Sequence, residues 1–220
     1  MISFSELLGK MEEESKKNNL VRRKVLHLSE VAICGFKYRY RLDNNLFIPF
    51  KLEFHVGNAF EFTMVNQMKK MKNIISQYSI PYIYGENEFI GHTDAYEINE
   101  NIIYELKSSF SRGDYSDIYI RQLKAYMIAN YKYTGNFSKG VLWYYNFVTK
   151  TYKETIFDTV TDYDRELLNK NLDAFTNNKY VDGIENSLCP FCENEKCPMW
   201  KVKNYKKKKM VIFNGSWKLQ

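Results

Sequence analysis

No apolar run in this sequence approaches the ~20 residues that a membrane-spanning helix needs. The first stretch, MISFSELLGKMEEESKK, is acidic and amphipathic, whereas a secretory signal peptide has a basic start and an apolar centre. Internal repeats and long flexible linkers are also missing. We therefore expect one soluble, cytoplasmic domain over residues 1–220, with no membrane partner and enough length to bury a core.

Cysteine is scarce, and its distribution is uneven. Three of the four cysteines form the run CPFCENEKC (Cys189, Cys192 and Cys197), and Cys34 stands alone far upstream. A reducing cytoplasm disfavours structural disulfides, so these residues are either small buried apolar side chains or metal ligands. The tight C-x2-C-x4-C spacing favours a metal or cluster site, for which Cys34 is the only remaining cysteine.

The charge balance permits an anionic partner without demanding one. Lysine and arginine outnumber aspartate and glutamate, which gives a net charge of +6. Hydrophobic residues make up 45% of the chain, and this share excludes a disordered protein. The stretch KYRYR, residues 37–41, alternates cations with aromatic rings. It could follow a phosphate backbone, or it could be a surface face whose long side chains cover apolar neighbours.

Helical and strand periodicities alternate along the chain. Steps of three and four predict helices over 3–17, from a cap at Ser29 through Cys34, over 50–72, from a cap at Asp114 or Ser116 over about 116–132, and over 163–177. Alternation predicts strands over 82–84, 88–98, 102–109, 140–148 and 151–157. This order predicts an α/β (α+β) fold, in which helices flank a mixed sheet.

The helix predicted over 50–72 carries a carboxylate on its apolar side. Its stripe consists of Phe54, Gly57, Glu61, Val65 and Met68. A buried carboxylate needs a partner or a metal, so Glu61 is a candidate ligand. His55 falls on a more mixed face, where an ordinary helix histidine is the simpler interpretation.

Three charged residues meet on the hairpin predicted for 88–109. Glu105 and Lys107 are two apart in a strand and therefore point to the same side. If the chain turns at 99–101, Asp94 lies beside Glu105 on the neighbouring strand. Two such carboxylates repel each other unless a cation lies between them, and Mg²⁺ or Mn²⁺ suits hard oxygen ligands. A lysine there can orient water or offset charge on a phosphate, although most E-x-K pairs are solvated surface.

The next helix places Gln122 and Tyr126 four residues apart on one face. The order Asp94, Glu105-Leu106-Lys107 and Gln122-x3-Tyr126 resembles the PD-(D/E)xK nuclease superfamily, and in particular its RecB-like branch. One cysteine before these motifs and three after them is similar to the iron–sulfur members of that branch. The length best resembles the CRISPR-associated fourth Cas protein family or a viral relative of it. The resemblance covers residues 29–200.

This resemblance implies a restriction-endonuclease-like core and a role for each matching residue. Asp94 and Glu105, with the backbone carbonyl of Leu106, would hold Mn²⁺ or Mg²⁺, and Lys107 would be the catalytic lysine. Gln122 and Tyr126 would contact DNA or brace the site. The family also has an early-helix ligand, usually histidine, four residues after a glycine. Here that place belongs to Glu61, four after Gly57, and His55 is the alternative. Thr93 replaces the proline that usually precedes the metal-binding aspartate.

The resemblance also implies a second cofactor. Cys34, Cys189, Cys192 and Cys197 would bind a 4Fe–4S cluster, and residues 29–48 and 179–203 would form a small lobe around it. The last cysteine gap is shorter than is usual in relatives, which leaves Zn²⁺ as an alternative, because four thiolates suit either.

The implied function is hydrolysis of DNA, with single strands or free ends as substrate. The family suggests a 5′→3′ exonuclease that could also cut internally, in CRISPR spacer acquisition beside an integrase partner, a step of antiviral defence, or in viral DNA processing. Five cations would follow the DNA backbone: Arg22, Arg23, Lys37, Arg39 and Arg41. The alternative is a non-catalytic, zinc- or cluster-stabilised nucleic-acid-binding module, which would be expected to have lost part of the Asp94, Glu105 and Lys107 set. A subunit that steers an integrase is compatible with either.

Overall fold

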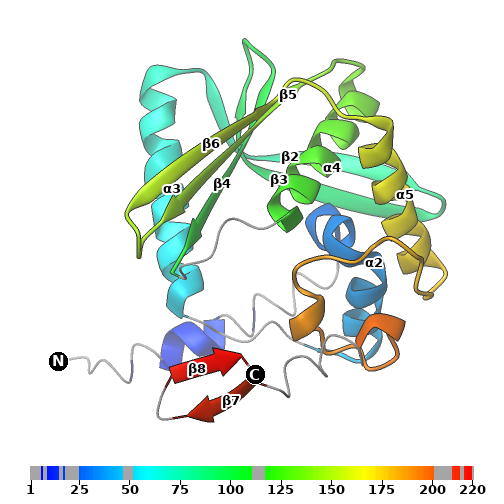
Figure 1. The fold of residues 1–220 in the computed structure, drawn as a ribbon. Coiled ribbons are helices and arrows are strands. Elements are labelled where there is room, and N and C mark those ends of the chain that lie inside the picture. Colours follow the sequence, from blue (N-terminus) through cyan, green and yellow to red (C-terminus); the bar gives the residue numbers. More distant parts are fainter. Residues whose placement is uncertain are drawn as a thin grey trace.

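The computed structural model describes residues 6, 9–14, 17, 25–46, 52–110, 117–200, 210–213 and 216–219. Its centre is a six-stranded mixed sheet with helices on both faces (Figure 1). The strands are β1 (Leu26–His27), β2 (Ile74–Tyr84), β3 (Asn87–Glu97), β4 (Ile102–Ser109), β5 (Lys139–Asn146) and β6 (Thr151–Phe157). The helices are α2 (Leu28–Asp43), α3 (Leu52–Met71), α4 (Asp117–Thr134) and α5 (Asp162–Thr176). A 3₁₀ turn η1 (Cys189–Phe191) and a separate hairpin of β7 (Met210–Phe213) and β8 (Ser216–Leu219) follow.

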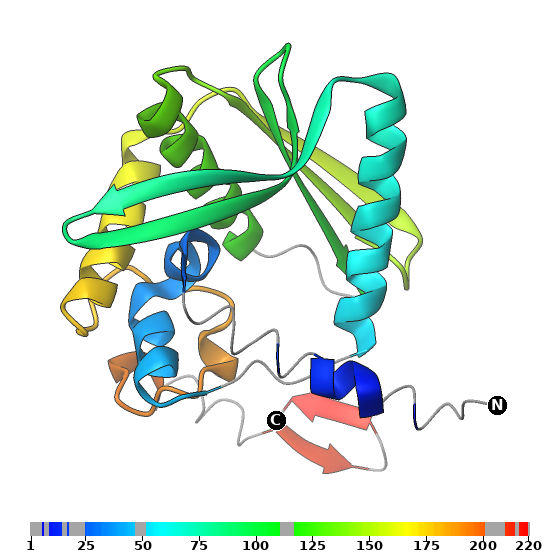
Figure 2. The same cartoon turned by 180° about the vertical axis from the view of Figure 1, so that it is seen from behind.

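The sheet consists of two halves that touch over a short stretch. β3 pairs with β2 along nearly its whole length, and β4 pairs with β5 throughout. Between these halves, β3 and β4 are paired only at Ala95–Tyr104, Tyr96–Ile103 and Glu97–Ile102. The two halves then diverge, as Figure 2 shows. Because β1 pairs with β3 only at Phe89 and Ile90, residues 91–94 have no ladder partner on this edge within the described chain.

The main core lies between the sheet and helices α2, α4 and α5. Leu28, Phe89, Leu123, Leu172 and Phe175 are fully buried there, because the apolar faces of these elements can only be removed from water against one another. On the other face of the sheet, α3 buries a smaller patch against β3 and β4 (Figure 2). Within the described residues, no helix is both long and apolar enough to cross a bilayer.

The predicted fold class is correct, and most predicted elements are present. Three details were wrong. The sequence predicted only the end of β2, which begins at Ile74. Helix α2 begins at Leu28 with His27 at its cap position, so Ser29 lies inside the helix instead of capping it. The predicted stripe of α3 is buried at Val65 and Met68, but Phe54 at its other end is 50% exposed, since α3 extends beyond the sheet there.

Candidate active site and thiolate site

Asp94, Glu105 and Lys107 meet where β3 and β4 diverge. The backbone N–H of Leu106 faces the place where a ladder partner on β3 would lie, and it donates instead to Oδ2 of Asp94 at 2.7 Å. Nζ of Lys107 lies 3.4 Å from the same oxygen and forms a close ion pair with Glu105. The divergence of two strands therefore brings two carboxylates and one ammonium into a buried cluster.

Glu105 is the most deeply buried of these groups. Its exposed fraction is 0%, and its Oε1 accepts a hydrogen bond from Nε2 of Gln122 at 2.5 Å as well as the Lys107 contact. Nε2 of Gln122 also lies 3.0 Å from the hydroxyl of Tyr126. Oε2 of Glu105 has no hydrogen-bond partner among the described residues. A buried oxygen without a partner is costly, and it is the kind of atom that a bound cation satisfies.

Glu61 reaches the same cluster from α3. It shares a hydrogen bond with Asp94, and its Oε1 accepts one from Nε2 of Gln77 at 3.0 Å. Burial, and then the charge of Asp94, raise the pKa of Glu61 to about 7. Burial and Asp94 likewise raise the pKa of Glu105. Three carboxylates thus share one nearby lysine, and the raised pKa values of Glu61 and Glu105 reflect their burial beside another carboxylate.

The contacts of α3 favour Glu61 over His55 as a possible metal ligand. His55 lies six residues before Glu61 and is partly exposed, whereas Glu61 bonds to Asp94 itself. Hard oxygen donors suit Mg²⁺ or Mn²⁺, and the carboxylates of Asp94, Glu105 and Glu61 lie together in this cluster. The unpartnered Oε2 of Glu105 agrees with that use.

Within the described part of the chain, no three His, Cys, Asp or Glu side chains are already arranged as a metal-binding group. At the acidic cluster the contacts give a physical reason. The ammonium of Lys107 lies against both Asp94 and Glu105, so the lysine itself supplies the positive charge there. A divalent ion would have to displace that ammonium from the carboxylates.

Gln77 is a site residue that the sequence analysis missed. It lies in β2 with a left-handed φ of 52°, and the β2–β3 ladder skips the pair that it would form with Asp94. Its side chain holds Glu61, as described above. A left-handed backbone in a non-glycine residue costs energy and marks a constrained position. Nothing in the strand pattern signals such a residue, so no sequence feature could have identified it.

The four cysteines come together at a second place, away from the acidic cluster. All are free thiols, and they line one small cavity between α2 and the loop that contains η1. Cys34 has non-helical backbone angles inside α2 (φ −165°, ψ 103°), and this kink interrupts the helix at the cavity. Beside it, a side chain on Gly35 would meet the carbonyl oxygen of Asn171 at 1.7 Å, so only glycine allows α2 to approach α5 this closely.

The four thiols are partly buried, and two of them accept hydrogen bonds from backbone amides. Burial raises the pKa of Cys34 to about 12, and burial also raises the pKa values of Cys192 and Cys197. Sγ of Cys189 accepts a hydrogen bond from the backbone N–H of Asn186 at 3.4 Å, and Sγ of Cys192 accepts one from that of Asn194 at 3.5 Å. The four thiols line one cavity, but no three of them are arranged as a metal-binding group among the described residues, so a metal or iron–sulfur cluster here stays a prediction.

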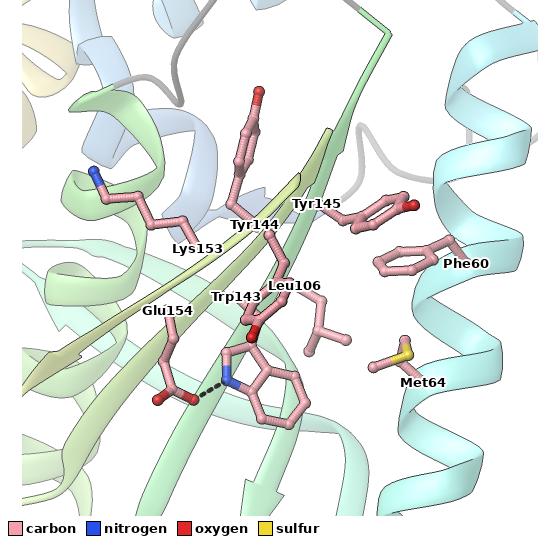
Figure 3. A pocket seen from close by; sticks show the side chains of 9 residues that line it. Phe60, Met64, Leu106, Trp143, Tyr144, Tyr145, Lys153 and Glu154 are labelled. Carbon is pink, nitrogen blue, oxygen red and sulfur yellow. Dashed lines mark hydrogen bonds between the residues drawn. The ribbon is translucent and has the colours of Figure 1, made fainter. Parts of the chain in front are cut away.

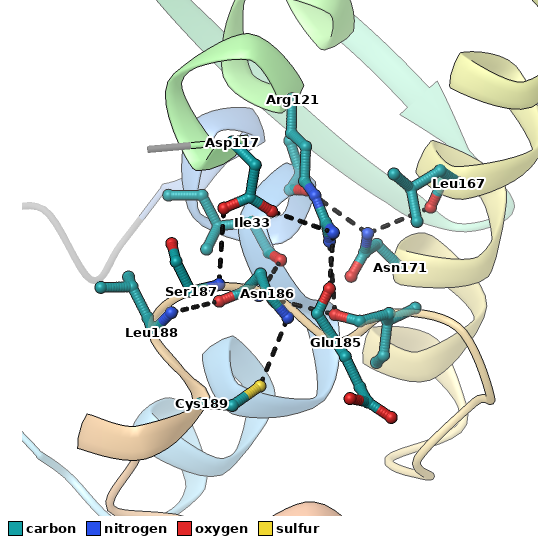
Figure 4. A network of polar contacts seen from close by, with 12 residues as sticks. Ile33, Asp117, Arg121, Leu167, Asn171, Glu185, Asn186, Ser187, Leu188 and Cys189 are labelled. Carbon is teal, nitrogen blue, oxygen red and sulfur yellow. Dashed lines mark hydrogen bonds and ion pairs between the residues drawn. The ribbon is translucent and has the colours of Figure 1, made fainter. Parts of the chain in front are cut away.

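Arg121, a residue of α4, holds the loop that precedes the cysteine run (Figure 4). Its guanidinium donates to the carbonyls of Ile184 (3.3 Å) and Glu185 (2.5 Å) and pairs with Asp117 at 3.2 Å. The next loop residue, Asn186, donates to the carbonyl of Ile33 in α2 at 2.8 Å. Because Arg121 directly precedes Gln122, one helix contacts both the thiolate loop and the acidic cluster.

Two of the cations predicted to bind DNA, Lys37 and Arg41, contact the loop between Cys192 and Cys197. Arg41 pairs closely with Glu193, and Lys37 lies 3.6 Å from the same carboxylate. Arg39 pairs with Asp43 at 2.9 Å. Arg22 and Arg23 lie outside the described residues. Lys37 and Arg41 therefore anchor the loop between Cys192 and Cys197 within the chain itself.

Comparison with protein-family models and with curated proteins found no match. Solved structures do match. A protein described as SSO0001 superposes with a TM-score of 0.64 at 17% identity, over 90% of this chain and 98% of that one. An alkaline exonuclease from Laribacter hongkongensis matches with a TM-score of 0.51 at 14% identity, over 88% and 97% of the two chains. Its complex with dAMP gives 0.52 with the same identity and coverage. The chain therefore has the mixed α/β, restriction-endonuclease-like fold of these structures.

Proposed function

We propose that this chain is a metal-dependent DNA nuclease of the PD-(D/E)xK kind, which hydrolyses phosphodiester bonds. The observation that carries the proposal is the buried Glu105, with one unpartnered oxygen, beside Asp94 and Lys107 at the divergence of β3 and β4. A fold shared with an alkaline exonuclease, which has also been crystallised with dAMP, supports this reaction and DNA as the substrate.

The chemistry follows from the residues of the cluster. Asp94, Glu105, Glu61 and the carbonyl of Leu106 would hold Mn²⁺ or Mg²⁺, which would lower the pKa of a bound water and polarise the phosphate. In the reaction the water oxygen would bond to phosphorus, the P–O bond to the departing strand end would break, and the released oxygen would take up a proton. The Lys107 ammonium, which lies beside Asp94 and Glu105, would offset the charge that builds on the phosphate oxygens. Gln122, braced by Tyr126, holds the Glu105 carboxylate in place.

The finer assignments rest on the order of the motifs and on the cysteine layout. We propose single-stranded DNA or free ends as substrate, and 5′→3′ exonuclease action with some internal cutting. The setting would be CRISPR spacer acquisition beside an integrase, or viral DNA processing. We also propose that Cys34, Cys189, Cys192 and Cys197 hold a 4Fe–4S cluster, with Zn²⁺ as the alternative. Residues 29–48 and 179–203, described over 29–46 and 179–200, would form the lobe around it.

The direct test is cleavage of single-stranded DNA by the purified protein with Mn²⁺ or Mg²⁺. We expect Lys107→Ala to lower the rate by about 10²–10³-fold, the loss typical of removing one charge-stabilising donor. Lys170→Ala is the control, because Lys170 pairs with Glu166 on α5 and should not affect cutting. End-labelled and circular substrates report direction and internal cutting. Undiminished cutting by folded Lys107→Ala would refute the mechanism, and binding of DNA without any cutting by the wild type would favour a non-catalytic module.

A further inference from the structure

An apolar groove lies between α3 and the β5–β6 side of the sheet (Figure 3). Its volume of about 470 Å³ is in the range of ligand-binding pockets, which is roughly 300–1,000 Å³. Most of its lining is aromatic or apolar, and the residues used here are Phe60, Met64, Leu106, Trp143, Tyr145 and Tyr152. Beside the groove, Val65 and Met68 of α3 pack on Ala95 and Leu106.

On both α3 and β4, a residue that lines the groove directly adjoins a residue of the acidic cluster in the sequence. On α3, Phe60 lines the groove while Glu61 bonds to Asp94. On β4, Leu106 lines the groove while Glu105 and Lys107 form the cluster on the other side of the strand. Leu106 and its neighbours Glu105 and Lys107 point to opposite faces of β4. A DNA strand with a phosphate at the cluster would reach the groove where β3 and β4 diverge, beyond their three paired positions.

The aromatic rings in the groove and beside it pack against one another. Phe60 stacks on Tyr145 with centroids 5.5 Å apart, and Phe147 packs edge-on against Phe60 at 5.6 Å. Phe110, at the end of β4, stacks on Phe147 at 4.6 Å. Nε1 of Trp143 donates to Oε2 of Glu154 at 2.5 Å, which fixes the plane of the indole (Figure 3). Held in this way, the rings can receive a flat ligand without losing much conformational freedom.

Tyr152 indicates that this surface is not only core packing. It lines the groove but is 85% exposed, so its ring contributes little to stability. The charged lining residues are Lys153 and Glu154, and Figure 3 shows Lys153 pointing away from Phe60 and Met64 while Glu154 lies beside Trp143. The groove itself therefore offers mainly aromatic rings, and such rings stack on unpaired bases without sequence preference.

We propose that this groove binds unpaired nucleobases of the DNA strand that the acidic cluster cuts. The inference rests on the proposed nuclease function and deepens it by assigning a base-binding site for the proposed single-stranded substrate. Bases within a duplex are already stacked and paired, so they cannot enter the groove without being unpaired. The groove therefore selects single strands and frayed ends.

Binding without cutting tests this inference. The anisotropy of a labelled oligothymidylate is measured with the full-length protein in EDTA, beside an abasic oligonucleotide of equal length. We expect Tyr152→Ala to weaken oligothymidylate binding by about fivefold or more, since stacking contributes about 1–3 kcal/mol per base. Binding of the abasic strand should not change, because it offers phosphates alone. Tyr163→Ala is the matched control, because Tyr163 is 66% exposed on α5 and does not line the groove.

The outcomes separate the groove from the nuclease site. If Tyr152→Ala binds oligothymidylate as tightly as the wild type does, the base-binding groove is overturned. It is also overturned if the wild type binds neither oligonucleotide. A dimer that Tyr152→Ala dissociates, with DNA binding unchanged, would assign the groove to a second copy of the chain and also overturn the proposal. None of these measurements involves metal or cutting. If the protein binds bases in this way but never cuts, only the nuclease proposal fails.

Discussion

At the scale of single residues, the acidic cluster is a problem of charge balance. Glu61, Asp94 and Glu105 share the ammonium of Lys107, and one oxygen of Glu105 has no partner among the described residues. Burial strengthens the repulsion between the carboxylates because less water screens it. The chain tolerates this arrangement by keeping protons on Glu61 and Glu105 at higher pH than usual. A divalent cation would relieve the same strain.

These protons predict how metal binding depends on pH. The pKa of Glu61 rises from 4.5 to about 7 on folding, so its contribution to stability is full below about pH 4.5 and is lost as pH rises through about 7. Mn²⁺ must displace these protons to bind. We expect Mn²⁺ to raise the melting temperature more at about pH 8 than at about pH 6, as measured by differential scanning fluorimetry. Glu61→Gln should reduce this pH dependence and His55→Ala should not. An equal Mn²⁺ effect at both pH values would contradict the assignment.

Two substitutions of Gln77 distinguish the cost of its left-handed backbone from the value of its side-chain hydrogen bond. Both Gln77→Ala and Gln77→Gly remove the hydrogen bond to Glu61, but only glycine adopts the φ of 52° without strain. We expect the glycine variant to be more stable than the alanine variant by about 1 kcal/mol in urea unfolding, and both to bind Mn²⁺ more weakly than the wild type. Equal stability of the two variants would show that the β2 backbone relaxes at this position.

At the scale of elements, α4 is the part that joins the two sites. One face carries Gln122 and Tyr126 toward the acidic cluster, and the ring of Tyr126 packs so closely on β3 that a side chain at Gly91 would meet it at 2.8 Å. Arg121, one residue before Gln122, holds the loop that leads to Cys189. A change in the thiolate loop therefore acts on the helix that positions Gln122.

This connection predicts the effect of removing the Arg121 guanidinium. Arg121→Met loses two hydrogen bonds to carbonyls and the Asp117 pair, which we expect to destabilise the protein by about 1.5–3 kcal/mol in urea unfolding. Hydrogen exchange should quicken over residues 184–189. Arg165→Met is the matched control, because its pair with the fully exposed Asp162 contributes little. If both variants lose the same stability, Arg121 does not clamp the loop.

The elements also explain what the sequence could predict. Strands β3 to β6 alternate clearly, and the short turn between β3 and β4 fixes their register, so Asp94 and Glu105 were expected to meet. The beginning of β2 was missed because Ser76, Gln77 and Ser79 interrupt its apolar pattern. The divergence of β3 from β4 was not predictable, since Asp94 replaces the missing ladder contact through its side chain. The kink at Cys34 depends on the distant Asn171, which a local pattern cannot indicate.

At the scale of the whole molecule, the thiolate site connects the two ends of the described core. Cys34 comes from α2, before the sheet, and the other three cysteines follow the last helix packed on it. Phe36 and Ile184 bury a small apolar cluster beside the cysteines, and Tyr180 packs against it. A bound metal would close a loop of more than half the chain, and such closure stabilises a fold by restricting its unfolded state.

The last prediction separates this cross-link from simple packing. We expect Cys192→Ala to lower the melting temperature of the anaerobically purified protein strongly, because metal binding contributes to folding. The wild type should be brown, with absorption near ~400 nm from thiolate-ligated iron, and the variant should lose that colour. After chelation, both proteins should melt at the same temperature, since the difference between them is the metal. A variant that is equally less stable before and after chelation would reduce Cys192 to a packing residue, and a colourless wild type that contains zinc would replace the cluster by a single ion.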